Sequence, residues 1–192
     1  MGDAIAPFVD DLARLRIQVF RDWPYLYEGS VAYEADYLQV YTRSKRGVAV
    51  LAFDGAKVVG ASTGLPLVEE SEAFIAPFAA AGYRPETVFY CGESVLLPAY
   101  RGQGLGHRFF DEREAHARGL GGFAWTAFCS VDRDPADPRR PAAHRDNDVF
   151  WRKRGYTPVP GMQVALPWPE VGADDEVPHT LTCWIRPLEV FW

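Results

Sequence analysis

The first part of the chain shows the apolar spacing of amphipathic helices. Apolar side chains recur at intervals of three and four at Leu12, Leu15, Val19 and Trp23. This spacing predicts a helix over residues 10–23, which ends at Pro24 because proline has no N–H for the preceding turn. A second helix is predicted after Ser30, a residue type that caps helix N-termini. Its aromatic stripe, expected to pack in the core, consists of Tyr33, Tyr37 and Tyr41.

From residue 48 onward, short apolar runs typical of β-strands alternate with helical segments. Val48–Phe53 and Lys57–Ser62, joined by the turn pair Asp54-Gly55, predict a β-hairpin. Further strands are predicted over Thr87–Leu97, Phe123–Ser130, Thr157–Leu166 and Leu181–Pro187. Further helices are predicted over residues 69–81, 104–118 and 144–154, and loops over residues 131–141 and 167–178. This order of elements predicts an α/β fold with a mixed sheet and helices on its faces.

Length and charge narrow the class of protein. The chain has 192 residues, which predicts a single domain over residues 1–192. Its net charge of −6 argues against nucleic-acid binding, which uses basic patches. No apolar run reaches the roughly 20 residues that span a bilayer, and the N-terminus lacks the pattern of a secretory signal. We therefore expect a cytoplasmic protein that binds neither nucleic acid nor membrane.

The three cysteines, Cys91, Cys129 and Cys183, are far apart and form no CxxC pair. All three lie in apolar, strand-like runs. We interpret them as buried small hydrophobic residues, and we expect no metal site.

The most informative segment is the strand–turn–helix unit that contains Arg101, Gly102, Gly104 and Gly106. The first N–H groups of a helix have no internal partners, so they bind anions when a ligand can reach the backbone. Glycine allows that approach, and an arginine side chain adds a charge that can bind phosphate oxygens in pairs. A P-loop would need Gly-Lys-Ser/Thr here, and a dinucleotide fingerprint would need glycine at position 107, which is histidine. The segment therefore predicts a pyrophosphate site of another kind.

Arg101-x-x-Gly104-x-Gly106 resembles the signature of the GNAT superfamily of acyl-CoA N-acyltransferases. Two other segments are also similar to that family: the residues just before the signature, Leu96-Leu97-Pro98, and the later segment Phe150-Trp-Arg-Lys-Arg-Gly-Tyr156. The resemblance implies a GNAT-like fold with a mostly antiparallel sheet, acetyl-CoA as cosubstrate and direct acetyl transfer to an amine of a small molecule or peptide. It also implies that some aromatic residues of the first helices border the acceptor site, and that a homodimer is among the expected states.

Coenzyme contacts are implied for the residues that match or flank these motifs. They are Leu96, Leu97, Arg101, Gly102, Gln103, Gly104, Leu105, Gly106, His107, Asn147 and Trp151. In the family, a backbone N–H of the fourth strand stabilises the oxyanion, which places that donor near Leu96.

An alkylammonium acceptor, with a pKa of roughly 10, must lose a proton before it can attack a thioester. Glu93 is the predicted base, because it lies in the apolar run YCGESVLL just before the glycine turn. Two alternatives are that Glu93 pairs with a buried arginine or faces water at a sheet edge. Strand alternation places Tyr90 and Ser94 on the face opposite Glu93, and Tyr90 is a rival base.

The sequence departs from the family at the residue that protonates the leaving thiolate. The family's tyrosine is Trp151 here, and its frequent asparagine falls on His144. His144 is therefore predicted to shuttle a proton or to contact the pantetheine arm, with a solvated surface position as the alternative. Asn147 is predicted to take the place of the asparagine, and Ser130 to replace the tyrosine hydroxyl in proton transfer. The departure also leaves open a module that binds acyl-CoA without turnover. A third alternative is an unrelated nucleotide-phosphate protein.

Arg113 falls on the apolar stripe of the helix predicted over residues 104–118. We interpret it as a side chain that reaches past the stripe to water.

Overall fold

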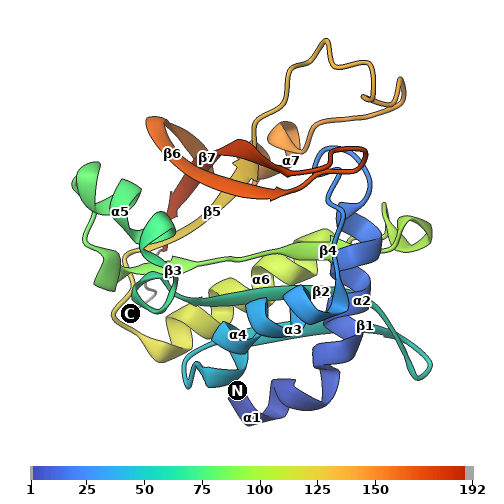
Figure 1. Cartoon of the computed structure of the whole chain (residues 1–192). Helices are drawn as coiled ribbons and strands as arrows, with labels where there is room; N and C mark the ends of the chain where they lie inside the picture. The colour runs from blue at the N-terminus through green and yellow to red at the C-terminus, as the bar shows by residue number, and fades with distance from the viewer. Residues whose placement is uncertain (1, 189–192) are drawn as a thin grey trace.

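The structure is a computed structural model that describes residues 2–188, and its seven strands form one twisted sheet (Figure 1). The strands are β1 (Val48–Asp54), β2 (Lys57–Pro66), β3 (Val88–Tyr90), β4 (Ser94–Leu96), β5 (Trp125–Val131), β6 (Thr157–Pro169) and β7 (Glu176–Pro187). Their order is β1-β2-β3-β5-β7-β6, and β4 also pairs with β2. Within the described residues, every pair is antiparallel except β3–β5. The predicted fold class, a mixed and mostly antiparallel sheet with helices, is confirmed.

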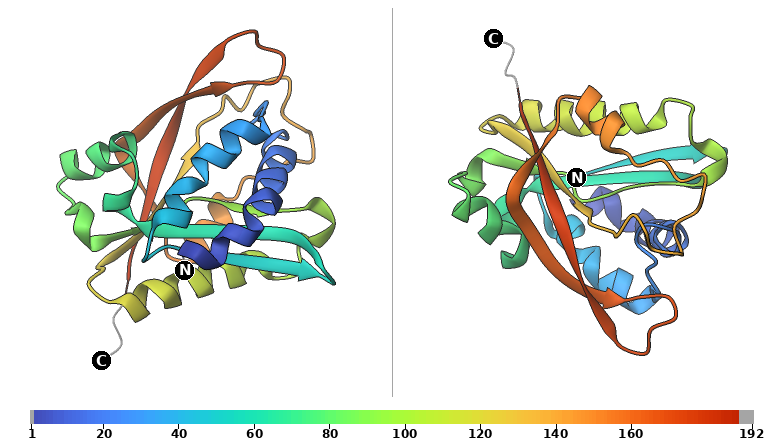
Figure 2. Two further views of the ribbon diagram at one scale, coloured as in Figure 1. Left: turned by 60° about the horizontal axis from the view of Figure 1, so that its bottom comes forward. Right: turned by 90° about the horizontal axis from the view of Figure 1, so that it is seen from above.

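The helices lie on both faces of the sheet. They are α1 (Gly2–Ile5), α2 (Val9–Phe20), α3 (Val31–Tyr37), α4 (Gln39–Arg43), α5 (Glu72–Ala80), α6 (Leu105–Leu120) and α7 (Asp148–Lys153). Short 3-10 turns are η1 (Ala6–Phe8), η2 (Leu67–Glu69), η3 (Pro85–Thr87) and η4 (Pro98–Tyr100). Helices α2 to α4 cover one face, while α6 and α7 lie on the other (Figure 2).

Each layer of helices buries its own apolar cluster against the sheet. Leu12 and Leu15 of α2 pack with Val59 of β2 and Val95 of β4. On the opposite face, the aromatic side chains of α6 and α7 pack with Phe128, Tyr156 and Trp184. The apolar spacing of the sequence therefore identified the buried face of α2 correctly. The three cysteines are buried with free thiols, as predicted.

The strand predicted over Thr87–Leu97 is wrong in one respect, because it is interrupted between β3 and β4. The N–H of Gly92 donates to Thr63 O, and the N–H of Thr63 donates to Glu93 O, both at 3.1 Å. This arrangement leaves one extra residue in the strand, which forms a bulge. The bulge reverses the alternation of side chains, so Tyr90 and Glu93 face the same cavity instead of opposite faces.

Several predicted boundaries also differ. The loop predicted over residues 167–178 is mostly strand, because Pro167 pairs with Pro178 and Trp168 with Val177 across the β6–β7 hairpin. Cross-strand pairing decides this extension, and local composition does not reveal it. The helix predicted over residues 10–23 ends at Phe20. The helix predicted over residues 144–154 begins only at Asp148.

No helix of the described residues is long and apolar enough to cross a bilayer.

Candidate active site

The site is organised by a separation of the two central strands. β3 runs parallel to β5 up to the pair Tyr90–Ala127, and the N–H of Cys91 then donates to Ala127 O at 2.7 Å. After this point, among the described strands, β4 pairs with β2 and β5 pairs with β7. The sheet therefore opens between β4 and β5.

The backbone of β4 presents polar groups to this opening. The N–H of Leu97 bonds Val59 O at 3.0 Å, and Glu93 O bonds the N–H of Thr63, so these residues face β2. Hydrogen-bonding residues alternate in an antiparallel pair, so Ser94 and Leu96 direct their N–H and C=O groups toward the opening. Leu96 O accepts a bond of 3.1 Å from Arg101 Nε, which holds that side chain beside the opening.

The glycine turn lies where β4 ends and α6 begins. Gly102 and Gly104 have φ of +75° and +82°, a conformation that side chains other than glycine rarely adopt. Among the described residues, none accepts a hydrogen bond from the backbone N–H groups of residues 102–106. These donors lie at the positive end of the α6 dipole. The turn is therefore open and offers its amides to an anion.

This geometry fits the diphosphate of coenzyme A. A Cβ atom at Gly102 or Gly104 would meet no protein atom within 4 Å, so the space above the turn is free for a ligand. Arg101 and Gln103 are exposed at its rim, and His107 is exposed in the first turn of α6. The turn thus combines accessible amides, a helix dipole and a cationic side chain, as the sequence predicts.

Helix α7 lies against the first turn of α6. The ring of Phe150 is 4.8 Å from that of His107 and 5.6 Å from that of Phe110. Arg154 donates to Asp111 Oδ1 at 2.7 Å and holds the two helices together. Asn147, the N-cap residue of α7, is exposed and makes no capping bond. The contacts of Phe150 and Arg154 therefore hold α7, which carries Trp151 and is preceded by Asn147, against the start of α6.

The indole of Trp151 is part of an aromatic cluster. Its ring is 4.9 Å from Phe128 and 5.1 Å from Trp184. The Nε1–H of Trp184 donates to Ser130 Oγ at 2.9 Å. Ser130 therefore shares a face with Trp151, and its hydroxyl hydrogen is left to donate elsewhere.

His144 lies apart from this cluster, in the segment before α7. Its Nε2 is 3.1 Å from Asp146 Oδ1, and its ring meets that of Trp23 edge-on at 6.1 Å.

Glu93 is buried and tied to other side chains. One carboxylate oxygen accepts from Thr63 Oγ1 at 2.8 Å, and the other accepts from Arg16 Nη1. Arg16 also donates through Nε to Glu34, so a single guanidinium joins two buried carboxylates. The structure thus shows Glu93 in a pair with a buried arginine, which was one of the alternatives.

The sequence did not identify Arg16 as the buried arginine, or Glu34 as its second partner, because both residues read as ordinary polar positions of two helices. The signal in the sequence was only that Arg16 follows Leu12 by four positions, which places it beside an apolar residue on the helix surface.

The interpretation of Arg113 as a side chain that reaches water is wrong. Arg113 is 2% exposed, and its Nη1 donates to Glu93 O at 3.1 Å and Thr63 O at 3.4 Å. The carbonyl groups at the bulge need donors, and the side chain of Arg113 supplies one from the opposite face of the sheet.

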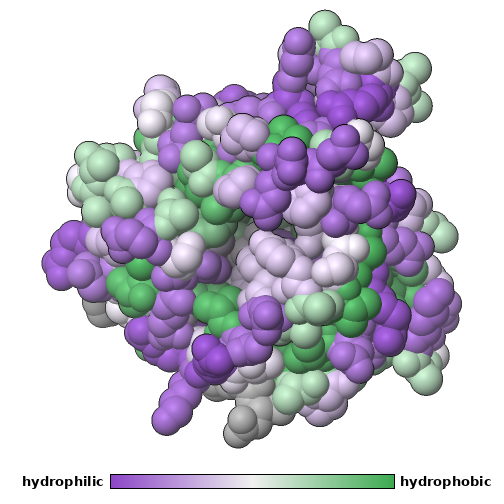
Figure 3. Space-filling model, viewed as in Figure 1, coloured by the Kyte–Doolittle hydropathy of each residue, from purple (hydrophilic) through white to green (hydrophobic). Residues whose placement is uncertain are grey.

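A cavity of about 350 Å³ lies beside the bulge and extends under α2, α3, α5 and the β6–β7 hairpin. Gly92, Glu93 and Tyr90 line its inner end, with Cys129 of β5. The molecular surface is hollowed near the middle of this face (Figure 3). Burial raises the pKa of Tyr90 well above its ordinary value, so its hydroxyl stays protonated at neutral pH. This protonation argues against Tyr90 as the rival base.

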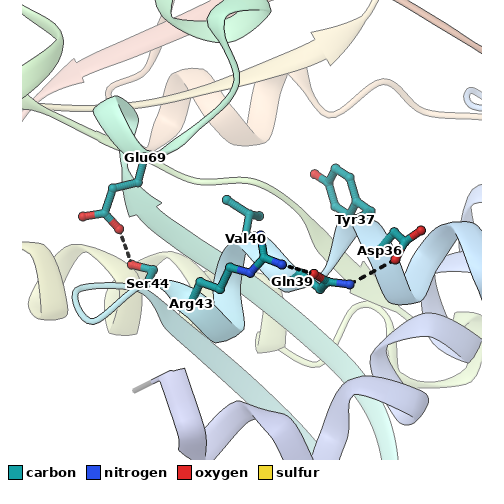
Figure 4. A pocket seen from close by; sticks show the side chains of 7 residues that line it. All are labelled: Asp36, Tyr37, Gln39, Val40, Arg43, Ser44 and Glu69. Atoms are coloured by element: carbon teal, nitrogen blue, oxygen red, sulfur yellow. Dashed lines mark hydrogen bonds between the residues drawn. The ribbon is translucent and has the colours of Figure 1, made fainter.

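A wider groove of about 570 Å³ adjoins the cavity, because Tyr37 and Val40 line both spaces. In the groove, Ser44 bonds Glu69, and Gln39 accepts from Arg43 and donates to Asp36 (Figure 4). Its polar groups are thus largely satisfied by one another. The described residues contain no cluster of three side chains suited to hold a metal ion.

Comparison with known proteins agrees with this architecture. The sequence profile of the acetyltransferase (GNAT) family matches residues 12–138. A comparison with curated proteins finds no match.

Solved structures with a similar fold cover nearly the whole chain. A ribosomal-protein-alanine N-acetyltransferase from Brucella melitensis has a TM-score of 0.60 at 13% identity, over 97% of this chain and 96% of that one. An aminoglycoside 6′-N-acetyltransferase from Enterococcus faecium has a TM-score of 0.56 at 16% identity, over 96% and 92%. An aminoglycoside 6′-N-acetyltransferase complexed with coenzyme A has a TM-score of 0.56 at 17% identity, over 94% and 90%. With the family profile matching most of its length, the chain belongs to the GNAT acetyltransferase family, and acetyl-CoA is its cosubstrate.

Proposed function

We propose that the protein is an N-acetyltransferase that moves an acetyl group from acetyl-CoA to a primary amine by direct transfer in a ternary complex. The acceptor is an amine of a small molecule or a peptide. One observation carries the proposal: the opening between β4 and β5 has the glycine turn at one end and an acid-lined cavity at the other. Donor and acceptor sites that meet at one opening are what direct transfer requires.

Acetyl-CoA supplies an acetyl thioester whose carbonyl carbon accepts a neutral amine. The amides of Gly102–Gly106 and the guanidinium of Arg101 bind its diphosphate. Leu96 directs its N–H into the opening, where it serves as hydrogen-bond donor to the thioester oxygen. Leu97 is held by its bond to Val59, which keeps the strand in register beside that donor.

We assign the acid–base roles from the positions of the side chains relative to the opening and the cavity. Glu93 lines the cavity next to the opening and stays a predicted base, although Arg16 and Thr63 engage both of its oxygens. Ser130 is the proposed donor to the departing sulfur, because Trp184 leaves its hydroxyl hydrogen available. Asn147 and Trp151 are proposed to border the pantetheine arm, and a proton-shuttle role of His144, whose contacts are with Asp146 and Trp23, stays a prediction.

A module that binds acyl-CoA without turnover is a second candidate. The observation in its favour is that Trp151, packed against Phe128 and Trp184, offers no ionisable proton where the family has a tyrosine.

A thiol-release assay with acetyl-CoA and a panel of primary amines separates the two. The enzyme releases thiol in proportion to the acetylated amine that mass spectrometry detects. Calorimetric binding of acetyl-CoA without thiol release from any amine would identify the silent module. The same preparation tests the further predictions of one domain over residues 1–192 and of a homodimer, by limited proteolysis and light scattering. A cytoplasmic location stays a prediction.

A further inference from the structure

The cavity beside the bulge is walled by aromatic rings. Its lining includes Phe20, Tyr25, Tyr37, Phe74, Tyr90 and Trp168. The rings pack against one another in pairs, with centroids 4.4 Å apart for Phe20 and Tyr25 and 5.1 Å apart for Phe74 and Tyr90. Packed rings form a rigid apolar wall, and their faces attract cations.

One carboxylate in this wall, that of Glu70, forms no ion pair with any described residue and accepts a single hydrogen bond. Glu70 follows η2 and lines the cavity, and its Oε2 accepts only the amide of Ser71, at 3.2 Å. Its Oε1 is buried and accepts no well-formed hydrogen bond among the described residues, and the nearby hydroxyl of Tyr41 is unpaired as well. A buried carboxylate oxygen without a donor is costly, so the position calls for a cationic or hydroxylic ligand.

The only cation lining the cavity, within the described residues, is already paired. Arg16 joins Glu93 and Glu34, so those three groups together carry one negative charge. Glu70 adds a second negative charge when it is ionised. The inner cavity therefore attracts an ammonium group and offers no unpaired cation to a carboxylate.

The groups that face Glu70 come from several elements. They are Arg16 of α2, Tyr37 of α3, Tyr41 of α4, Tyr90 of β3, Glu93 of the bulge, Cys129 of β5 and the amide of Ser71. Burial raises the pKa of Glu70 to about 7. The Ser71 amide has the next largest effect and lowers this pKa, the charge of Glu93 raises it, and Tyr41 and Arg16 lower it by less. A carboxylate that titrates near neutral pH both binds an ammonium and takes its proton.

We infer that Glu70 binds the acceptor ammonium and takes its proton, and that the acceptor is a compact primary amine with an aromatic or flat apolar body and no carboxylate. This inference rests on the proposed function and names the acceptor class of that same site. The aromatic wall takes the apolar body, and Glu70 takes the ammonium.

The proton and electron changes are as follows. The ammonium gives one proton to the Glu70 carboxylate and becomes a neutral amine. The nitrogen lone pair forms the new C–N bond to the acetyl carbon as the C–S bond breaks, and the bonding electrons leave with sulfur. The nitrogen loses a second proton, which goes to sulfur to give the thiol, and Glu70 returns its own proton to water.

A matched pair of amines tests the acceptor class. 2-Phenylethylamine and phenylalanine share a ring and an ammonium and differ by the carboxylate. By calorimetry in the presence of coenzyme A, we expect 2-phenylethylamine to bind about tenfold or more tightly, because the carboxylate meets no free cation. Equal or tighter binding of phenylalanine, or of an aminoglycoside, would overturn the acceptor class.

A matched pair of variants tests the role of Glu70. Glu70→Gln should lower kcat/KM for 2-phenylethylamine at pH 7 by about 100-fold and recover much of it near pH 10, where the free amine is abundant. Glu69→Gln is the control, because Glu69 bonds Ser44 and Arg46 in the outer groove and should change kcat/KM by less than about twofold.

The outcomes are distinguishable. If the parent protein acetylates no amine, the proposed function fails, and the role of Glu70 as proton acceptor fails with it. If the parent is active and Glu70→Gln keeps its pH profile, the role of Glu70 alone is overturned. The binding comparison decides the acceptor class in either case.

Discussion

The guanidinium of Arg113 donates a hydrogen bond of 3.1 Å to the backbone oxygen of Glu93. The bond crosses the sheet from α6, which carries the glycine turn at its start, to the bulge that borders the acceptor cavity. One buried side chain therefore links the helix of the coenzyme site to the strand of the acceptor site.

Arg113→Met tests this link. The carbonyl groups of Thr63 and Glu93 keep a backbone donor each, so the fold should persist with a loss of about 1–3 kcal/mol in the free energy of unfolding. Because the bulge loses its support, kcat/KM should fall further than stability alone explains. Urea denaturation and steady-state kinetics measure the two effects. Arg113→Lys, which keeps a cationic donor, should lie between the parent and the methionine variant, and a methionine variant with parental kcat/KM would contradict the role.

Gly104→Val tests the glycine turn. Valine is strained at a φ of +82°, and its side chain projects into the open space where the diphosphate is proposed to bind. Calorimetry should show affinity for acetyl-CoA reduced by about 100-fold or more. Gly82→Val is the control, since Gly82 has a φ of +85° and the same open surroundings at the end of α5. Both variants should lose similar stability, and parental affinity in Gly104→Val would refute the assignment.

Gly92→Ala tests the close packing at the bulge. A Cβ atom at this position would lie 1.8 Å from the Tyr41 hydroxyl, so the bulge or α4 must move. We expect a loss of about 1–3 kcal/mol in the free energy of unfolding, the usual cost of overpacking. The double variant Gly92→Ala/Tyr41→Phe removes the hydroxyl and should recover part of that loss. Additive effects in the double-mutant cycle would show that the contact is not the cause.

Glu93→Gln tests Glu93, the base predicted from the sequence, as the alternative to Glu70. Loss of the charge leaves Arg16 with Glu34 alone, so stability should fall by about 1–3 kcal/mol. If Glu93 is the base, turnover falls at neutral pH and recovers in part at high pH. If it only positions Arg16 and the bulge, the pH–rate profile keeps the parental shape at a lower level. The profile, measured from pH 6 to 10, decides between the two.

The raised pKa of Glu70 also predicts how stability depends on pH. The pKa of Glu70 is about 7 in the folded protein, whereas the ordinary value for a glutamate, expected in the unfolded chain, is 4.5. Between these values the folded state binds more protons than the unfolded state, so stability falls as pH rises through this window. Above pH 7 the ionised Glu70 destabilises the fold by an amount on the order of 3 kcal/mol. Glu70→Gln should therefore raise the Tm at pH 8 and leave it nearly unchanged at pH 4.5. Thermal unfolding followed by circular dichroism at both pH values checks this. A Tm of Glu70→Gln below that of the parent at pH 8 would show that the ionised Glu70 does not destabilise the fold.

The sequence by itself determined the features that depend on local chemistry. The buried face of α2, the cap of α3 at Ser30 and the turn at residues 101–106 each follow from residue types at fixed short spacings. The fold class followed from the order of such elements, and the family from the motifs around the turn.

Only the tertiary structure decided the chemistry of the acceptor cavity. The bulge at Gly92 and Glu93 arises from pairing with β2, about thirty positions earlier in the chain, so strand alternation placed Tyr90 on the wrong face. Arg113 was expected to reach from the apolar stripe of its helix to water, and Arg16 gave no signal of its role, yet both are buried against partners distant in sequence. Glu70 stood in a polar stretch that sequence reasoning passed over. Burial and the charge of distant neighbours determine which carboxylate is paired and which is free, and these depend on contacts that no short window of sequence contains.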